Sequence, residues 1–152
     1  MPPSDPGLED GADDEGDDER PASRPSGGEL VLLAEDEPAV RRLLCRTLEA
    51  GGYRVLEASN GLEALELARS SEQQIDLLMT DVVMARMGGP ELADELRRDL
   101  PDLPILYLSG YPQQLEANWP NETAGQDFMQ KPFRRDALLK RLRGLLERAA
   151  EG

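Results

Sequence analysis

Short runs of apolar residues recur along the chain, and each run is followed at once by a polar or turn-forming position. Runs of this kind are typical of buried strands, most often in a parallel sheet. They predict five strands, at residues 30–34, 53–58, 75–80, 105–109 and 127–130. The second run alternates between apolar and polar residues, which favours a position at the edge of the sheet.

Between these runs, apolar residues return every three or four positions, the spacing of a helix with one buried face. The spacing predicts helices at about 38–48, 62–68, 90–100, 113–117 and 135–149. Proline stands at the start of the first and third helices, where its missing N–H costs nothing. Strand and helix therefore alternate along the chain. This order predicts an α/β fold, a doubly wound five-stranded parallel sheet with helices on both faces.

The formal net charge is −14 over 152 residues, but the acidic residues are concentrated near the amino terminus. Ten acidic residues and two arginines lie within residues 1–29. Residues 1–28 are also rich in Pro, Gly and Ser, and such a segment buries too little apolar surface to offset its ordering entropy. We therefore expect a disordered acidic tail at 1–28 and one folded domain at 29–150.

Histidine is absent from the sequence, which excludes histidine-based catalysis, histidine metal sites and a phosphohistidine carried by this chain. The single cysteine, Cys45, cannot form an internal disulfide and fits a reducing compartment. The sequence has neither a signal-peptide pattern nor an apolar run near the ~20 residues that span a bilayer. No region is basic enough for a nucleic-acid surface. We expect a cytoplasmic protein that binds neither membranes nor nucleic acid.

Polar residues stand where four of the predicted strands end. Glu35 and Asp36 follow the first strand, Asp81 the third, Ser109 ends the fourth and Lys131 follows the fifth. The carboxyl ends of parallel strands share one edge of the sheet, where ligands usually bind. Two carboxylates about 4 Å apart repel by roughly 4 kcal/mol at an effective dielectric near 20. A cluster of three carboxylates therefore needs a cation to stay charged, and Mg²⁺ favours such oxygen ligands.

A carboxylate in this position can also act as a nucleophile toward a phosphoryl group, a reaction that depends on positioning and charge stabilisation. Simpler interpretations exist for each residue. Asp81 also suits a loop cap, and the acids at 35–37 also suit a helix start. Ser109 also suits a turn, and Lys131 also suits an ordinary surface position.

Four pieces of sequence, in order and suitably spaced, resemble the receiver domain of two-component response regulators. The pieces are LVLLAEDEPAVRRLL, DLLMTDVVMARMGGPEL, ILYLSGYP and FMQKPF, and the resemblance covers about residues 29–150. The LSGYP piece resembles receivers attached to hybrid sensor kinases. The resemblance implies a flavodoxin-like receiver fold with strand order 2-1-3-4-5.

The resemblance also implies a role for each polar residue at the sheet edge. Asp81 matches the phosphate acceptor, and Lys131 matches the lysine that pairs with the phosphoryl group. The remaining matches are Glu35, Asp36 and the Val83 backbone carbonyl as Mg²⁺ ligands with Asp81, Ser109 as the switch hydroxyl, Phe128 as the switch aromatic, and Pro132 after a cis peptide bond. The chain departs from the family at Ala85, where proline is usual, and in using Glu35 with Asp36 where two aspartates are usual.

The implied function is signalling by phosphoryl transfer. A histidine kinase or histidine phosphotransfer protein would supply a phosphohistidine, and Asp81 would accept the group in a Mg²⁺-dependent step. The output would be an unidentified partner protein, or a homodimer through the surface of the last two strands and the helices at 113–117 and 135–149. We expect no enzyme activity on a separate substrate, because aspartyl phosphatases need a second Asp where Val83 stands. The alternative is a receiver-like interaction module that does not switch.

Overall fold

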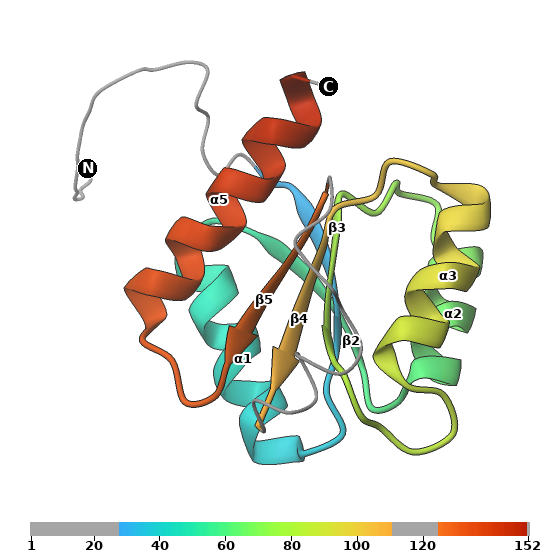
Figure 1. Cartoon of the computed structure of the whole chain (residues 1–152), viewed down its shortest axis with the longest axis horizontal. Helices are drawn as coiled ribbons and strands as arrows, with labels where there is room; N and C mark the ends of the chain where they lie inside the picture. The colour runs from blue at the N-terminus through green and yellow to red at the C-terminus, as the bar shows by residue number, and fades with distance from the viewer. Residues whose placement is uncertain (1–27, 111–124, 152) are drawn as a thin grey trace, which may run out of the picture.

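The computed structural model describes residues 28–110 and 125–151 and contains a five-stranded parallel sheet between helices (Figure 1). The strands are β1 (Leu30–Ala34), β2 (Arg54–Ala58), β3 (Leu77–Asp81), β4 (Ile105–Ser109) and β5 (Gln126–Gln130). The helices of the described residues are α1 (Pro38–Ala50), α2 (Gly61–Ser70), α3 (Gly89–Asp99) and α5 (Arg135–Glu151).

The strand order is β2-β1-β3-β4-β5, and every neighbouring pair is parallel. The predicted fold and strand order are therefore confirmed. The edge position predicted for the alternating second run is confirmed as well, because β2 lies at one end of the sheet and is only partly buried. By contrast, all residues of β1, β3 and β4 are buried, as expected for strands covered on both faces.

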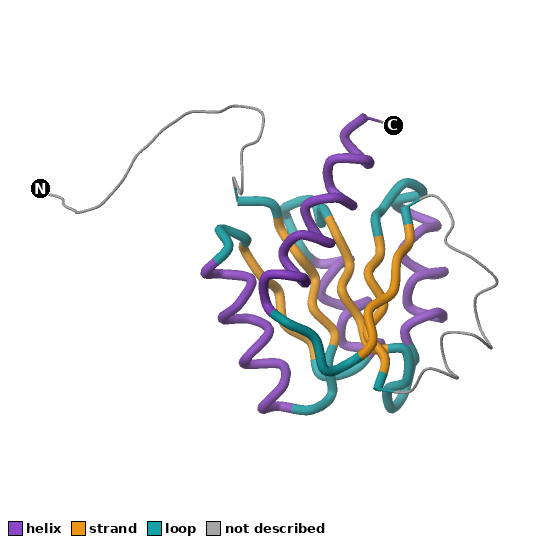
Figure 2. Tube along the Cα trace, turned by 60° about the vertical axis from the view of Figure 1, so that its left-hand side comes forward, coloured by secondary structure: helices purple, strands orange, loops and turns teal. Residues whose placement is uncertain are grey.

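Helices cover both faces of the sheet, so the domain has three layers (Figures 1 and 2). Helices α1 and α5 pack on one face through Leu44, Leu48, Leu138 and Leu142. Helices α2 and α3 pack on the other face, where Leu92 and Leu96 lie in the core. Successive residues of β1 contribute to opposite cores, as the two-residue period of a strand requires.

The third strand differs from its prediction at both ends. It begins at Leu77 and includes Asp81, because the amide of Val82 still donates to the carbonyl of Leu108 at 3.0 Å. Asp76 lies before the strand and fixes the start of β1: its amide donates to the Leu30 carbonyl, and its carboxylate accepts from the Leu30 amide, both at 2.8 Å. Asp81 is therefore held by the sheet rather than by a loop.

Two glycines bring neighbouring segments close to the end of β3. A Cβ on Gly89, the first residue of α3, would lie 2.3 Å from the carbonyl oxygen of Asp81. A Cβ on Gly61, at the start of α2, would lie 2.2 Å from the carbonyl oxygen of Met87. Contacts this short exclude any side chain without a backbone shift. Both helices can therefore begin directly behind the polar edge of the sheet.

Two predictions fall on residues that the structure does not describe. The helix at 113–117 lies outside the described residues, and so does the tail, apart from Gly28. The division into 1–28 and 29–150 stays a prediction. Among the described helices, none is both long and apolar enough to cross a membrane.

Candidate functional site

The carboxyl ends of β1, β3, β4 and β5 bring the predicted polar residues to one edge of the sheet. A cavity of about 380 Å³ opens there. It is lined by Glu35, Asp36, Glu37, Val40, Asp81, Val83, Leu108, Ser109, Gly110 and Lys131. The parallel register explains this arrangement, because each strand of the group ends at the same level of the sheet.

Lys131 links two of the acidic residues. Its Nζ lies 2.8 Å from Asp81 Oδ1 and 2.9 Å from Glu35 Oε1. The side chain of Glu35 is only 1% exposed, whereas that of Lys131 is 28% exposed. The second carboxylate oxygen of Glu35 accepts a hydrogen bond from the Glu37 amide at 3.1 Å. The ammonium therefore holds the carboxylates at the ends of β1 and β3 together.

A third carboxylate completes an acidic cluster. One oxygen each from Glu35, Asp36 and Asp81 lies within 4.8 Å of the other two. Asp36 is exposed and makes no hydrogen bond or ion pair with the described residues, whereas Glu35 and Asp81 are buried. Among the described residues a single ammonium faces three carboxylates, so the cluster keeps an excess of negative charge.

Burial and repulsion act strongly on Asp81. Burial of the carboxylate, followed by its proximity to Glu35, raises the pKa of Asp81 from 3.8 to about 7, although Lys131 opposes the shift. Burial alone would lower the pKa of Lys131, but its contacts with Asp81 and Glu35 outweigh burial and raise that pKa above its ordinary value. The Lys131 ammonium therefore stays charged, whereas the charged form of Asp81 is destabilised.

The donor set fits a hard divalent cation. Asp81 Oδ1 is buried, and it shares the Lys131 ammonium, 2.8 Å away, with Glu35 Oε1. Three converging carboxylates match the oxygen ligands that Mg²⁺ prefers. Because one ammonium is shared between carboxylates, the cluster keeps negative charge that a bound cation would balance.

The remaining residues predicted for the site lie beside the cavity or next to Lys131 in the sequence. Ser109 is buried at the end of β4 beside the cavity, and its carbonyl accepts from the Lys131 amide at 2.7 Å. Val83 lies at the cavity in the loop after β3, with 61% of the residue exposed. The peptide bond between Lys131 and Pro132 is cis.

Phe128 does not line the cavity. It lies three residues before Lys131 on β5, and its ring stacks on that of Tyr107 on β4, with 5.7 Å between ring centroids and 18° between the planes. Tyr107 is buried and pairs directly with Phe128 across the two strands. The sequence analysis missed Tyr107, although strand alternation alone indicates that a residue two positions before Ser109 shares its face.

Arg41 is a second residue that the sequence analysis missed. Its Nη1 donates to the carbonyl oxygen of Glu35 at 2.8 Å from the first turns of α1. The sequence does place Arg41 six residues after Glu35, in a helix that starts at the acidic loop, and this spacing was the sequence feature that could have indicated the contact.

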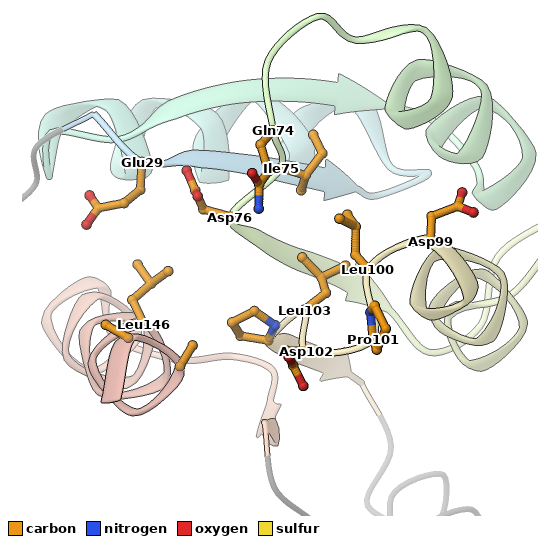
Figure 3. A pocket seen from close by; sticks show the side chains of 13 residues that line it. Glu29, Gln74, Ile75, Asp76, Asp99, Leu100, Pro101, Asp102, Leu103 and Leu146 are labelled. Atoms are coloured by element: carbon orange, nitrogen blue, oxygen red, sulfur yellow. The ribbon is translucent and has the colours of Figure 1, made fainter. Parts of the chain in front are cut away.

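A larger cavity of about 470 Å³ opens at the opposite edge of the sheet (Figure 3). Its apolar lining includes Leu100, Leu103 and Leu146, and acidic side chains such as Asp99 and Asp102 lie around it. No lysine or arginine lines it within the described chain, and the residues around it offer no nucleophile beside a base. Size alone therefore does not mark it as the functional site.

Comparison with known proteins identifies the class. Residues 31–143 match the model of the response regulator receiver domain, and the chain belongs to this family of phosphoacceptor modules of two-component systems. It is similar to the sensor kinase CckA of Brucella abortus (strain 2308), with 40% identity over 123 residues, or 81% of this chain and 13% of that protein. It is also similar to the response regulator MprA of Mycobacterium ulcerans (strain Agy99), with 39% identity over 118 residues, or 78% of this chain and 50% of that protein.

Solved structures agree with this assignment. The receiver domain of the hybrid histidine kinase CckA shares 38% identity and a TM-score of 0.66, covering 77% of this chain and 98% of that chain. The response regulator TrrA of Thermotoga maritima, in complex with Mg²⁺ and BeF, shares 30% identity and a TM-score of 0.67, with coverages of 77% and 98%. The predicted resemblance to receivers of hybrid sensor kinases is confirmed. The chain spans half or less of the length of the curated relatives it matches.

Proposed function

We propose that Asp81 is the phosphoacceptor of this receiver domain and that it takes a phosphoryl group from a phosphohistidine on a histidine kinase or histidine phosphotransfer protein. The observation that supports this most directly is the Asp81 carboxylate itself. It ends a buried strand, lines an open cavity and lies 2.8 Å from the ammonium of Lys131. A buried acid at the mouth of a cavity beside a fixed cation is arranged for attack on an anionic phosphoryl group.

We propose Glu35, Asp36, Asp81 and the Val83 backbone carbonyl as the ligands of a Mg²⁺ ion. The convergence of three carboxylates, which share a single lysine ammonium among the described residues, supports this assignment. When bound, Mg²⁺ would supply positive charge to the phosphoryl oxygens and relieve repulsion among the carboxylates.

The proposed transfer needs no proton from the protein. An oxygen of the Asp81 carboxylate attacks phosphorus, the new O–P bond forms, and the P–N bond to the donor imidazole breaks with its electron pair returning to nitrogen. Lys131 holds Asp81 Oδ1 and keeps an ammonium beside the incoming charge. Ser109, buried at the end of β4, would then turn its hydroxyl toward a phosphoryl oxygen. The chain acts on itself, so we do not propose an enzyme with a separate substrate.

The phosphoryl group adds up to about two negative charges and three acceptor oxygens at this edge. We propose that Ser109 reorients around them and that the surface of β4, β5 and α5, which includes Phe128, changes with it. A partner protein or a second copy of the chain would read that surface. The exchange would take place in the cytoplasm, where the buried free thiol of Cys45 stays reduced.

The test is phosphorylation by a small donor that contains a P–N bond. The protein is incubated with phosphoramidate and Mg²⁺, and intact mass spectrometry measures the phosphoryl adduct. We expect one acid-stable, base-labile adduct in the wild type and none in Asp81→Asn. Asp76→Asn is the matched control, because it makes the same change at the other end of the same segment and should still be phosphorylated.

The possible results separate the competing interpretations. An adduct that persists in Asp81→Asn would place the acceptor elsewhere. Absence of an adduct from the folded wild type, with no effect of Mg²⁺ on its amide spectrum, would favour the module that keeps the fold without switching.

A further inference from the structure

Arg41 connects helix α1 to the acidic loop after β1. Its Nη1 donates to the Glu35 carbonyl oxygen at 2.8 Å, and its Nε lies 3.7 Å from a carboxylate oxygen of Glu57 on β2. The side chain of Arg41 is 19% exposed, so most of it is enclosed between the helix and the sheet edge. Helix α1 begins at this edge, immediately after the acidic residues (Figure 1). The guanidinium therefore fixes the backbone from which two candidate ligands project.

The loop has few other restraints. The Glu35 amide donates to the Ala58 carbonyl at 3.1 Å, and the Glu37 amide donates to the Glu35 carboxylate at 3.1 Å. The first turn of α1 lacks a side-chain cap. Asp36 makes no hydrogen bond or ion pair with the described residues, so its carboxylate is positioned by the backbone of the loop. Any contact that fixes the Glu35 carbonyl therefore also fixes the origin of the Asp36 side chain.

We infer that Arg41 is a positioning residue for the cation site: its hydrogen bond to the Glu35 carbonyl holds Glu35 and Asp36 where they converge with Asp81. This inference rests on the proposed Mg²⁺ site and extends it to a residue that contacts none of the three carboxylates of the acidic cluster. Groups that hydrogen-bond to metal ligands and orient them usually contribute strongly to metal affinity. Their removal commonly weakens that affinity roughly tenfold or more.

A charge effect and a positioning effect predict opposite results. The guanidinium is a positive charge beside an acidic cluster, so its removal should strengthen cation binding if charge were its only role. If Arg41 positions the ligands, its removal should weaken cation binding in spite of the more negative site. The direction of the change in Mg²⁺ affinity therefore distinguishes the two roles.

The experiment measures the dissociation constant for Mg²⁺ alone, from backbone amide shifts of the unphosphorylated full chain. Arg41→Met removes both the charge and the donor, and Arg41→Lys keeps the charge with a single ammonium. Arg42→Met is the matched control, because Arg42 is the neighbouring residue of α1, is exposed, and its side chain makes no hydrogen bond or ion pair with the described residues. Melting curves report whether each variant folds.

We expect the dissociation constant to rise about tenfold in Arg41→Met, to rise less in Arg41→Lys, and to stay equal or fall slightly in Arg42→Met. An unchanged or lower constant in Arg41→Met overturns the inference. If Arg41→Met does not fold, Arg41→Lys decides in the same way, since a wild-type constant there contradicts positioning. Failure of the wild type to bind Mg²⁺ would instead refute the proposed cation site, so the two failures are distinguishable.

Discussion

Replacing Asp81 with asparagine should stabilise the metal-free protein against unfolding. The side chain is only 8% exposed, and burial and Glu35 raise its pKa from 3.8 to about 7. The raised pKa means that the folded protein disfavours the charged form of Asp81, relative to its protonated form, by on the order of a few kcal/mol. Asparagine keeps the size and one acceptor oxygen without the charge, and Lys131 keeps its contact with Glu35 at 2.9 Å.

That balance already includes the ion pair between Asp81 and Lys131, which opposes the rise in pKa. We therefore expect a gain in the free energy of unfolding of roughly 1 to 3 kcal/mol at pH 8. The pH dependence has a defined sign. Between about pH 4 and pH 7 the folded state binds more protons at Asp81 than the unfolded state, so wild-type stability falls as pH rises through this window. The difference between variant and wild type should open over this range and stay constant above it.

Urea denaturation in the presence of a chelator, followed by circular dichroism at pH 5 and pH 8, measures the difference. The control is Asp76→Asn, which should not stabilise, because the Asp76 carboxylate accepts a hydrogen bond from the Leu30 amide at 2.8 Å. Added Mg²⁺ should raise the stability of the wild type and not that of Asp81→Asn. If Asp81→Asn is no more stable than the wild type at pH 8, the account of a destabilised buried carboxylate is wrong.

Three other substitutions test contacts that hold the fold together, and urea denaturation measures each. Gly89→Ala should destabilise by about 2 kcal/mol or more, because its Cβ would lie 2.3 Å from the Asp81 carbonyl oxygen; a neutral result would mean that α3 is not tightly placed. Arg86→Gly should stabilise by about 0.5 to 1 kcal/mol, since Arg86 has a φ of 74°, and a loss would contradict local strain. Arg97→Met should cost about 1.5 to 3 kcal/mol, because the guanidinium donates to the carbonyls of Leu103 and Gly125, whereas the exposed Arg98→Met should change little.

Local pattern was enough to predict the architecture. The apolar runs and the helical spacing between them required helices on both faces of a parallel sheet, and the carboxyl ends of its strands share one edge. The approach of Glu35, Asp81 and Lys131 follows from that topology alone, because each residue ends or follows a strand of the same sheet. The boundary of β3 was less certain, since the hydrogen bond from Val82 to Leu108 depends on register and not on composition.

A local sequence pattern does not predict contacts between side chains of different helices and strands. The sequence places Arg41 on α1 but does not show that its guanidinium reaches back to the Glu35 carbonyl. Likewise, the family resemblance implies that Phe128 is the switch aromatic, but its stacking on Tyr107 depends on how β4 and β5 pair. Both contacts depend on rotamers and register, which only the assembled structure defines.

The polar edge illustrates how a site can destabilise the fold that carries it. Strands β1 and β3 are fully buried, and each delivers a carboxylate to a place where water is largely excluded. Lys131 balances one negative charge, and Asp36 adds another that has no partner among the described residues. Binding of the proposed cation would relieve the repulsion within the cluster, and the energy recovered would contribute to binding affinity. A protein that replaced Asp81 with a neutral residue would gain stability and, under the proposed function, would lose both a cation ligand and the phosphoacceptor, so stability and function place opposite demands on this position.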